Sequence, residues 1–239
     1  GRLQRFRKAS GAIYRRALEE EADLYHFHDP EFLPFAARMT RKGKKVIYDV
    51  HEDLPRQLMT KHYIPGPLRK SASLIGEHME NQYARKMSGI ITATSFIRDR
   101  FLRIHKEVMD IKNYPLLVEG ISNPARDRKT GEIVYIGSLT RERGISELVK
   151  ALEHADPGIR LNLAGTFSPD SYRSALTRLN GWKQVNEIGY ADRQRAQELM
   201  NSSFAGMVTL HPTVNYLDAL PVKMFEYMSA GIPVIASNF

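Results

Sequence analysis

The chain contains no cysteine, only one tryptophan and no long hydrophobic run. Without cysteine, the protein can form neither a disulfide framework nor a thiolate metal site, which fits a reducing compartment. No apolar stretch of the sequence approaches the roughly 20 residues that a membrane-spanning helix needs. These absences argue against a small disulfide-stapled domain and offer no candidate for a transmembrane helix. The expected location is therefore cytoplasmic.

The remaining composition is that of a soluble globular protein, with 42% hydrophobic and 26% charged residues. A length of 239 residues is comfortable for two small domains, each with its own core. The net charge of +8 falls entirely within residues 1–115, because acids and bases balance in residues 116–239. This asymmetry suggests that one half meets phosphates, nucleic acid or an acidic membrane face. A basic surface without a partner explains the charge equally well.

Short apolar runs alternate with longer segments along the chain. The runs are rich in β-branched and aromatic residues, as strands are, and the longer segments have helix-like spacing. In the first half the candidate strands are 22–28, 44–50 and 88–94, and a candidate helix is 76–87. In the second half the candidate strands are 132–138, 159–165, 184–190 and 205–211, with candidate helices at 145–155, 171–180 and 195–203. The alternation predicts an α/β protein with parallel sheets covered on both faces.

A segment with weak periodicity separates the two halves. It reads NYPLLVEGISNPARDRKTGE (113–132) and contains two prolines, two glycines and clustered charge, as interdomain linkers often do. We therefore predict an N-terminal Rossmann-like domain at 1–115, a linker at 116–131 and a C-terminal Rossmann-like domain at 132–239.

The last stretch, LDALPVKMFEYMSAGIPVIASNF, predicts a loop, a helix and a strand. Pro221 suits the first turn of the helix, Asp218 is a candidate cap, and Gly231 is a natural stop. Asp218 and Glu226 are separated by seven residues. On one continuous helix they would stand roughly 12 Å apart along the axis and about 80° apart around it. The two acids are therefore predicted on nearly the same side of the helix.

The start of this helix is expected at the carboxyl edge of the second sheet, where open α/β sheets bind ligands. Amide groups at a helix N-terminus suit a phosphate, and carboxylates pair with the vicinal hydroxyls of ribose or hexose. The pattern favours a ligand with phosphates in its middle and sugar rings at both ends. The plainer alternative is that Asp218 only caps the helix and Glu226 only lies on a solvated face.

Two motifs carry a resemblance to a known family. LDALPVKMFEYMSAGIPVIAS resembles the donor-site signature of glycosyltransferase family 4, whose members are retaining enzymes of the GT-B fold. The first glutamate of that signature is replaced here by Asp218, and the second matches Glu226. YIGSLTRERGI (135–145) resembles the family's Gly-Arg-Leu motif and the Lys-Gly that follows it shortly afterwards. Ser138 replaces its arginine, and Arg143 replaces its lysine.

The resemblance implies a GT-B-like α/β fold, in which two Rossmann-like domains with parallel sheets face each other across a cleft. It also implies a nucleotide-diphosphate sugar as co-substrate. By this resemblance Glu226 would hold the ribose hydroxyls, and Asp218 would contact the transferred sugar.

The diphosphate of the donor would be held by positive groups around the motif residues. The resemblance assigns this role to Arg143 and to the helix N-terminus around Leu220 and Pro221, with help from Lys223, while Gly137 matches the glycine of the second motif. Stabilising the leaving diphosphate in this way lowers the barrier to transfer without a metal. Neither a cofactor nor a metal is therefore expected.

Segments of the first half resemble the family's acceptor domain, namely 23–34, 46–53 and 89–101. By this resemblance His51 matches a histidine near the reacting sugar, where it would hold the sugar or steady an oxocarbenium-like transition state. Without the resemblance, a histidine that bonds the following loop explains His51 as well. The family normally has an earlier first strand and further units after its counterpart of 232–237. We therefore expect the sequence to be the middle part of a longer enzyme.

Histidines and acids of the first half also suggest a metal cluster. His26 and His28 alternate along a candidate strand and so face the same side, a real spacing for metal ligands but a weak signal alone. The nearby candidates are Asp29, Asp49, His51 and Asp53. A metallohydrolase would need further ligands from later strands, where histidine is scarce. Sugar transfer is the favoured interpretation, and the plain alternative for His26 is a packed strand residue.

We therefore expect a retaining, hexosyltransferase-like enzyme in glycan, polysaccharide or glycolipid synthesis, with a glycan or lipid-linked acceptor. The basic segments 2–8, 41–45 and 69–73 would attract an anionic membrane from its inner face or a phosphorylated acceptor. Nucleic acid is not expected, because these segments hold few aromatic residues and no recognised motif. Two alternatives remain: a nucleotide-sugar epimerase of the same fold, and a non-catalytic basic module that binds membrane or nucleic acid.

Overall fold

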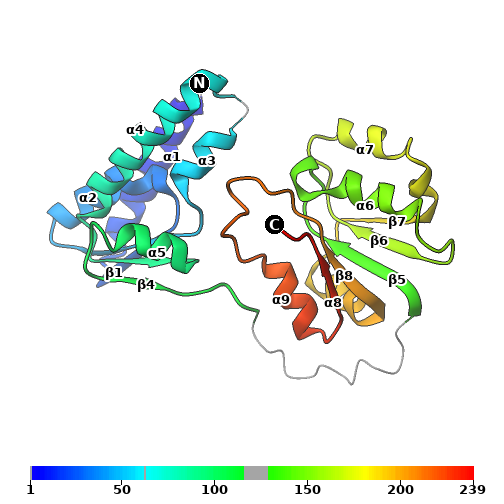
Figure 1. Cartoon of the computed structure of the whole chain (residues 1–239). Coiled ribbons are helices and arrows are strands. Elements are labelled where there is room, and N and C mark those ends of the chain that lie inside the picture. Colours follow the sequence, from blue (N-terminus) through cyan, green and yellow to red (C-terminus); the bar gives the residue numbers. More distant parts are fainter. Residues whose placement is uncertain (1, 62, 116–128) are drawn as a thin grey trace. The chain divides into compact units, whose positions relative to one another are not determined.

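The computed structural model describes residues 2–61, 63–115 and 129–239 (Figure 1). The chain forms two compact units. The first comprises residues 1–113 together with 217–220, and the second comprises residues 114–216 together with 221–239. Most of the predicted linker, residues 116–128, lies outside the described residues, and residues 129–131 belong to the first strand of the second unit.

The first unit is an α/β unit with one parallel sheet in the order β1-β2-β3-β4. Alternate residues of β2 (Val46, Tyr48 and Val50) are buried in a core formed with the helices. The residues between them, among them Asp49, are half-buried, so the two faces of this sheet are covered unequally. The elements are α1 (Arg2–Glu19), β1 (Leu24–Phe27), η1 (Pro30–Phe32), α2 (Leu33–Arg41), β2 (Lys45–Val50), α3 (Leu54–Thr60), α4 (Gly66–Ala84), β3 (Gly89–Thr92), α5 (Ser95–Phe101) and β4 (Val108–Asp110).

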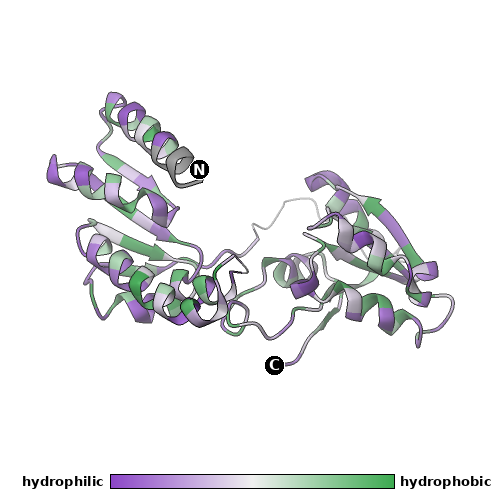
Figure 2. Ribbon diagram, turned by 90° about the horizontal axis from the view of Figure 1, so that it is seen from above, coloured by the Kyte–Doolittle hydropathy of each residue, from purple (hydrophilic) through white to green (hydrophobic). Residues whose placement is uncertain are grey.

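Side-chain caps and packing fix where the helices of the first unit begin. Asp53 accepts a hydrogen bond from the backbone N–H of Arg56 and starts α3, and Thr94 caps α5 through Ile97. Figure 2 shows hydrophilic and hydrophobic residues interspersed along the helices, as expected for helices with one buried face. Among the helices that the structure describes, none combines the length and the apolar character needed to cross a bilayer.

One polar cluster lies inside the core of the first unit. Glu80 on α4 is buried, and its carboxylate accepts hydrogen bonds from the Tyr48 hydroxyl and from Nη2 of Arg100, both at 2.8 Å. Burial raises the pKa of Glu80, while the hydrogen bonds from Arg100 and Tyr48 oppose that rise. Burial also raises the pKa of Tyr48, and the neighbouring Glu80 adds to this effect. The cluster therefore ties α4, β2 and α5 together.

The second unit has a five-stranded parallel sheet in the order β7-β6-β5-β8-β9. The chain runs outward from β5 through β6 to β7, and then returns to place β8 on the other side of β5. Its elements are β5 (Lys129–Ile136), η2 (Arg141–Arg143), α6 (Ile145–Leu152), β6 (Arg160–Ala164), α7 (Ser171–Leu176), η3 (Asn180–Gln184), β7 (Val185–Gly189), α8 (Arg193–Ser202), β8 (Ser203–Val208), α9 (Val222–Ser229) and β9 (Val234–Ala236).

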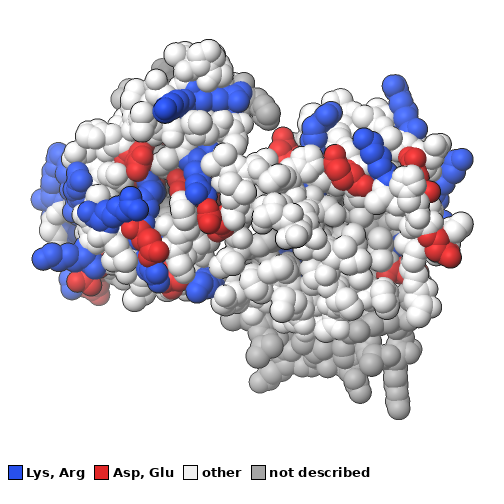
Figure 3. Space-filling view, in the orientation of Figure 1, with Lys and Arg blue, Asp and Glu red and all other residues white. Residues whose placement is uncertain are grey.

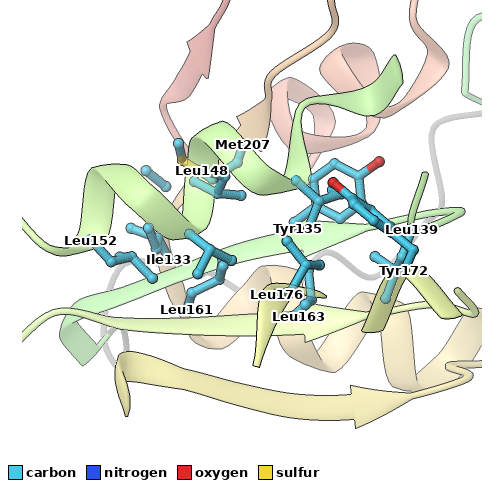
Figure 4. Close-up of a cluster of buried hydrophobic side chains, with 13 residues drawn as sticks. Ile133, Tyr135, Leu139, Leu148, Leu152, Leu161, Leu163, Tyr172, Leu176 and Met207 are labelled. Carbon is cyan, nitrogen blue, oxygen red and sulfur yellow. The ribbon is translucent and has the colours of Figure 1, made fainter. Parts of the chain in front are cut away.

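The second sheet is covered on both faces. Ile133 and Tyr135 of β5 belong to a core cluster with α6 and α7, drawn in Figure 4, while Val134 and Ile136 belong to a cluster with α8 and α9. Because neighbouring strand residues point to opposite faces, residues 133–136 of β5 form a continuous apolar run that serves both clusters. The arrangement confirms the prediction of a parallel α/β sheet with helices on both sides.

Candidate functional site

The second sheet changes winding direction at β5, and ligands of open α/β sheets bind at such a switch point, beyond the carboxyl ends of the strands. The segments at this edge include the turn after β5, the helix η2, the extension of β8 and the start of α9. Gly137, Arg143, Pro221, Lys223 and Glu226, which the sequence predicted for donor binding, all lie on these segments or on α9.

Glycines let these segments approach each other at backbone distance. Gly165 has φ +147°, and a Cβ atom there would lie 1.8 Å from the carbonyl oxygen of Gly137. Gly144 has φ +69°, and a Cβ there would lie 1.8 Å from the carbonyl oxygen of Thr209. Both positions therefore require glycine, because a side chain would meet rigid backbone and the dihedral angle disfavours one. The turn after β5 and the start of α6 are held closely in place.

Arg143 is anchored through its backbone and positioned through a buried tyrosine. Its carbonyl oxygen accepts a hydrogen bond from Oγ1 of Thr209, at 3.0 Å, which ties η2 to the extension of β8. Its guanidinium interacts with the Tyr135 hydroxyl, which donates to the carbonyl of Ser138 at 3.1 Å. Burial raises the pKa of Tyr135 to about 12 even though Arg143 opposes that rise. Arg143 is thus held near the turn that contains Ser138.

The helix α9 is fixed to the sheet by Tyr227, which is completely buried. The Tyr227 hydroxyl accepts a hydrogen bond from the backbone N–H of Ile136, at 3.0 Å, and burial raises its pKa. A Cβ on Gly206 of β8 would lie 2.3 Å from the tyrosine ring, so the ring packs directly on the strand backbone. The residue before Tyr227 is Glu226, whose position therefore follows from this packing.

Glu226 forms an ion pair with Lys223 one turn earlier on α9. Both side chains are partly exposed, at 27% for Glu226 and 33% for Lys223. The helix begins at Val222, with Pro221 as its N-cap residue and no side-chain cap. Its first amide groups therefore lack the partner that a capping side chain would supply. A carboxylate, an ammonium group and a helix N-terminus occur together within a few residues.

The helix-based geometry predicted for the two acids is wrong. Because α9 begins at Val222, Asp218 lies in the preceding segment and neither caps the helix nor shares its axis. Asp218 and Leu220 belong to residues 217–220, which associate with the first unit. There the Asp218 carboxylate accepts a hydrogen bond from the guanidinium of Arg56, which also stacks over the Phe96 ring at 3.8 Å.

His51 lies just beyond β2 in the first unit, beside three other residues that the sequence suggested as ligands. His26 Nε2 is 2.9 Å from Asp49 Oδ2, and His28 Nδ1 is 2.7 Å from His51 Nε2. Of the other candidates, Asp53 is used as the cap of α3, and Asp29 precedes η1 without a capping hydrogen bond. The structure therefore brings four of the six candidates together.

Sequence reasoning missed several residues that shape these sites. Tyr227 was missed because it belongs to no motif of polar residues. Two signals could have suggested its packing on β8: the tyrosine directly follows Glu226, and Gly206 lies within a buried strand. His211 Nε2 lies 3.0 Å from Oε2 of Glu147, which links the segment that follows β8 to α6. Partial burial favours a higher pKa for Glu147, but the hydrogen bond and the charge of His211, together with a backbone hydrogen bond and Lys150, outweigh burial, and the pKa is lowered.

Two family profiles match the chain. The profile described as Glycosyltransferase Family 4 matches residues 1–110, and the profile described as Glycosyl transferases group 1 matches residues 121–239. No curated protein sequence matches the chain.

Solved structures resemble the chain over nearly its whole length. Anabaena HepE in complex with UDP has a TM-score of 0.71 at 18% identity, over 95% of this chain and 62% of that structure. Sucrose-phosphate synthase from Thermosynechococcus elongatus has a TM-score of 0.70 at 18% identity, over 98% of this chain and 60% of that structure. The lipopolysaccharide outer core galactosyltransferase WaaB has a TM-score of 0.62 at 18% identity, over 98% of this chain and 61% of that structure. The chain thus spans about three fifths of the length of these structures.

Proposed function

Because this chain belongs to the glycosyltransferases of group 1 and family 4 and has their GT-B fold, we propose that it transfers a sugar from a nucleotide-diphosphate sugar to an acceptor, with retention of configuration. The observation that carries this proposal is the arrangement at the carboxyl edge of the second sheet. There Tyr227 fixes the helix that bears Glu226, and backbone contacts fix Arg143 on η2.

Glu226 is the proposed ligand of the ribose. A carboxylate can accept two hydrogen bonds from vicinal hydroxyls, and the partial exposure of Glu226 leaves it accessible. Lys223 balances the charge of Glu226. When a nucleotide binds, the ribose takes over the carboxylate oxygens and Lys223 becomes available to a phosphate.

The diphosphate is proposed to bind between Arg143 and the N-terminus of α9 at Pro221, beside the turn at Gly137. Arg143 offers a fixed positive charge, and the helix N-terminus offers free amide groups and the positive end of its dipole. Charge that grows on the leaving diphosphate is stabilised by these groups in the transition state. In this proposal the transfer step needs neither a cofactor nor a metal.

The first unit is proposed to bind the acceptor. His51 would contact the reacting sugar from this unit, and Asp218, together with the adjoining Leu220, would approach the same sugar. The hydrogen bond of Asp218 with Arg56 supports this role, because an arginine that holds one carboxylate oxygen orients the other. The products are proposed to be glycans, polysaccharides or glycolipids made in the cytoplasm.

A peripheral membrane contact of the first unit is the second part of the proposal. Leu68, Ile75 and Met79 are exposed along α4, and their spacing of seven and four residues puts them on one stripe of the helix. Figure 3 shows Lys and Arg side chains spread over the visible face of this unit. An apolar stripe in basic surroundings fits an anionic leaflet that holds a lipid-linked acceptor.

Sedimentation of the protein with anionic vesicles should fall as the salt concentration rises, and equal binding to neutral vesicles would contradict the proposal of a membrane contact.

The donor site is tested by titrating UDP, GDP, ADP, TDP and CMP, with and without EDTA. The structures of HepE hold UDP and UDP-glucose, which makes UDP the first nucleotide to test. The expected result is saturable binding of one diphosphate that EDTA does not change. If none of the nucleotides binds to the folded protein, the proposed donor site is wrong for this chain.

Replacing Glu226 by alanine is expected to weaken nucleotide binding by about 1–3 kcal/mol, the usual effect of losing a hydrogen bond to a charged group. Isothermal titration of the variant with the preferred diphosphate measures this loss. Glu198→Ala is the matched control, because Glu198 is a half-exposed acid on α8 of the same unit and is expected to leave affinity unchanged. Equal affinities of the Glu226 variant and the original protein would remove Glu226 from the site.

A further inference from the structure

Three imidazoles and one carboxylate converge at the carboxyl ends of β1 and β2. In the parallel register of these strands His26 pairs with Ile47 and Phe27 with Tyr48, and one residue further His28 comes level with Asp49. Side chains at alternate positions point to the same face, so His26, His28, Asp49 and His51 all face one way. Two short strand segments thus produce a compact group of four potential ligands.

The potential ligand atoms are spaced as they would be around one small cation. Single ligand atoms of His26, His28 and Asp49 all lie within 4.8 Å of one another. Asp49 Oδ2 is 2.9 Å from His26 Nε2 and 3.4 Å from His28 Nδ1. In a tetrahedral zinc site with bonds of about 2.0–2.1 Å, ligand atoms are roughly 3.3–3.4 Å apart. Small side-chain adjustments therefore suffice to place an ion between them.

His51 is close enough to be a fourth ligand. Its Nε2 atom is 2.7 Å from His28 Nδ1 and 3.5 Å from Asp49 Oδ1. Each neutral imidazole has one N–H and one lone pair, so the ring nitrogens of His28 and His51 can bond each other only when one donates a proton and the other accepts it. A divalent cation would instead accept the lone pairs of all the rings and balance the charge of Asp49.

Burial in the cluster suits an accessible metal site. The Asp49 side chain is 13% exposed, whereas His26, His28 and His51 are 45%, 56% and 49% exposed. The Asp49 carboxylate therefore lies close to the sheet, and the three imidazoles lie between it and the solvent. An ion can enter directly from water.

We propose that His26, His28, Asp49 and His51 form a binding site for a divalent transition-metal ion of the zinc type. Imidazole nitrogens select Zn²⁺, Co²⁺ or Ni²⁺ over Mg²⁺ and Ca²⁺, which prefer sets of oxygen ligands. The site belongs to the first unit and is separate from the groups proposed to hold the donor diphosphate, which do not use a metal. It shares His51 with the proposed sugar contact, so a bound ion would take His51 away from that contact.

The test is metal binding by the tag-free chain after removal of metals with EDTA and dialysis. Titration with Zn²⁺ is expected to saturate at one ion per chain, and Co²⁺ is expected to give the visible absorption bands of a four-coordinate site. Mg²⁺ should not compete with Zn²⁺ for the site. His26→Ala and His28→Ala should each weaken Zn²⁺ binding at least about tenfold, since loss of even an outer partner costs roughly 10–100-fold.

The controls separate this site from unspecific binding and from the donor site. His154→Ala, which removes an exposed histidine of the second unit, should bind Zn²⁺ as the original chain does. Asp49→Asn keeps the shape of the side chain and should also weaken binding. Nucleotide affinity of the His26 variant should stay unchanged, so failure of the donor proposal would be seen independently. Absence of Zn²⁺ binding, or equal binding by all the variants, would overturn the metal site.

Discussion

Replacing Glu80 by alanine is expected to destabilise the first unit by about 3–5 kcal/mol, because it removes one partner of a buried ion pair. Arg100 would lose the acceptor of its Nη2 hydrogen bond, while its Nε and Nη1 atoms are buried and have no hydrogen-bond partner among the described residues. The Tyr48 hydroxyl would lose its acceptor as well. Urea unfolding followed by far-UV circular dichroism measures the change.

Two variants distinguish loss of the polar cluster from a general effect on α4. Glu77→Ala makes the same substitution one turn earlier on α4, at a half-buried position, and is expected to cost less than about 1 kcal/mol. Glu80→Gln keeps two polar atoms in place, so its loss of stability should lie between the losses of the two alanine variants. If Glu80→Ala were no more destabilising than Glu77→Ala, the cluster would contribute nothing to the stability of this unit.

Tyr227→Ala is expected to destabilise the second unit by about 3–5 kcal/mol, the range for deleting a fully buried aromatic side chain. The deletion leaves a cavity above Gly206 and frees α9 from β5. Because the same helix carries Glu226, nucleotide binding should weaken together with stability. The fluorescence of Trp182, the only tryptophan of the chain, follows unfolding of this unit.

Tyr227→Phe separates the hydroxyl from the ring. It preserves the packing on Gly206 but leaves the N–H of Ile136 without its acceptor, which costs about 1–3 kcal/mol. We expect this smaller loss of stability with little change in nucleotide affinity. Equal stability of the phenylalanine and alanine variants would show that the ring does not hold α9 in the way that the structure indicates.

The central strands of the second unit, β5, β6 and β8, were predictable because most of their residues are buried on both faces and therefore appear as short apolar runs. Short runs rich in β-branched and aromatic residues also predicted β1, β2 and β3, but not β4, whose three residues are too few to produce a pattern. Also missed from the sequence were α1, which contains 18 residues, and the shorter helices α2, α3 and α5, which contain 9, 7 and 7 residues. Short helices bury few side chains, so packing against a sheet decides them more than periodicity does.

The candidate site was predictable where chemistry is local in sequence, and less so where it depends on packing. Lys223 and Glu226 are one helical turn apart, so their proximity could be anticipated. The first residue of α9 could not be anticipated, because Pro221 fits either the N-cap or the first turn of a helix. In the structure Pro221 is the N-cap, so Asp218 lies outside the helix. The meeting of His28 with His51 depends on strand register, which no single segment reveals.

The bond between Ile136 and Tyr227 makes one backbone amide a natural probe of the donor helix. The N–H of Ile136 is protected by a side chain of α9, so its exchange with deuterium requires that helix to lift from the strand. Exchange at this amide, compared with exchange at the interior of β5, measures how often α9 detaches without global unfolding. A ligand held by Glu226 should slow that exchange. Motion of the helix can therefore be followed without any mutation or label.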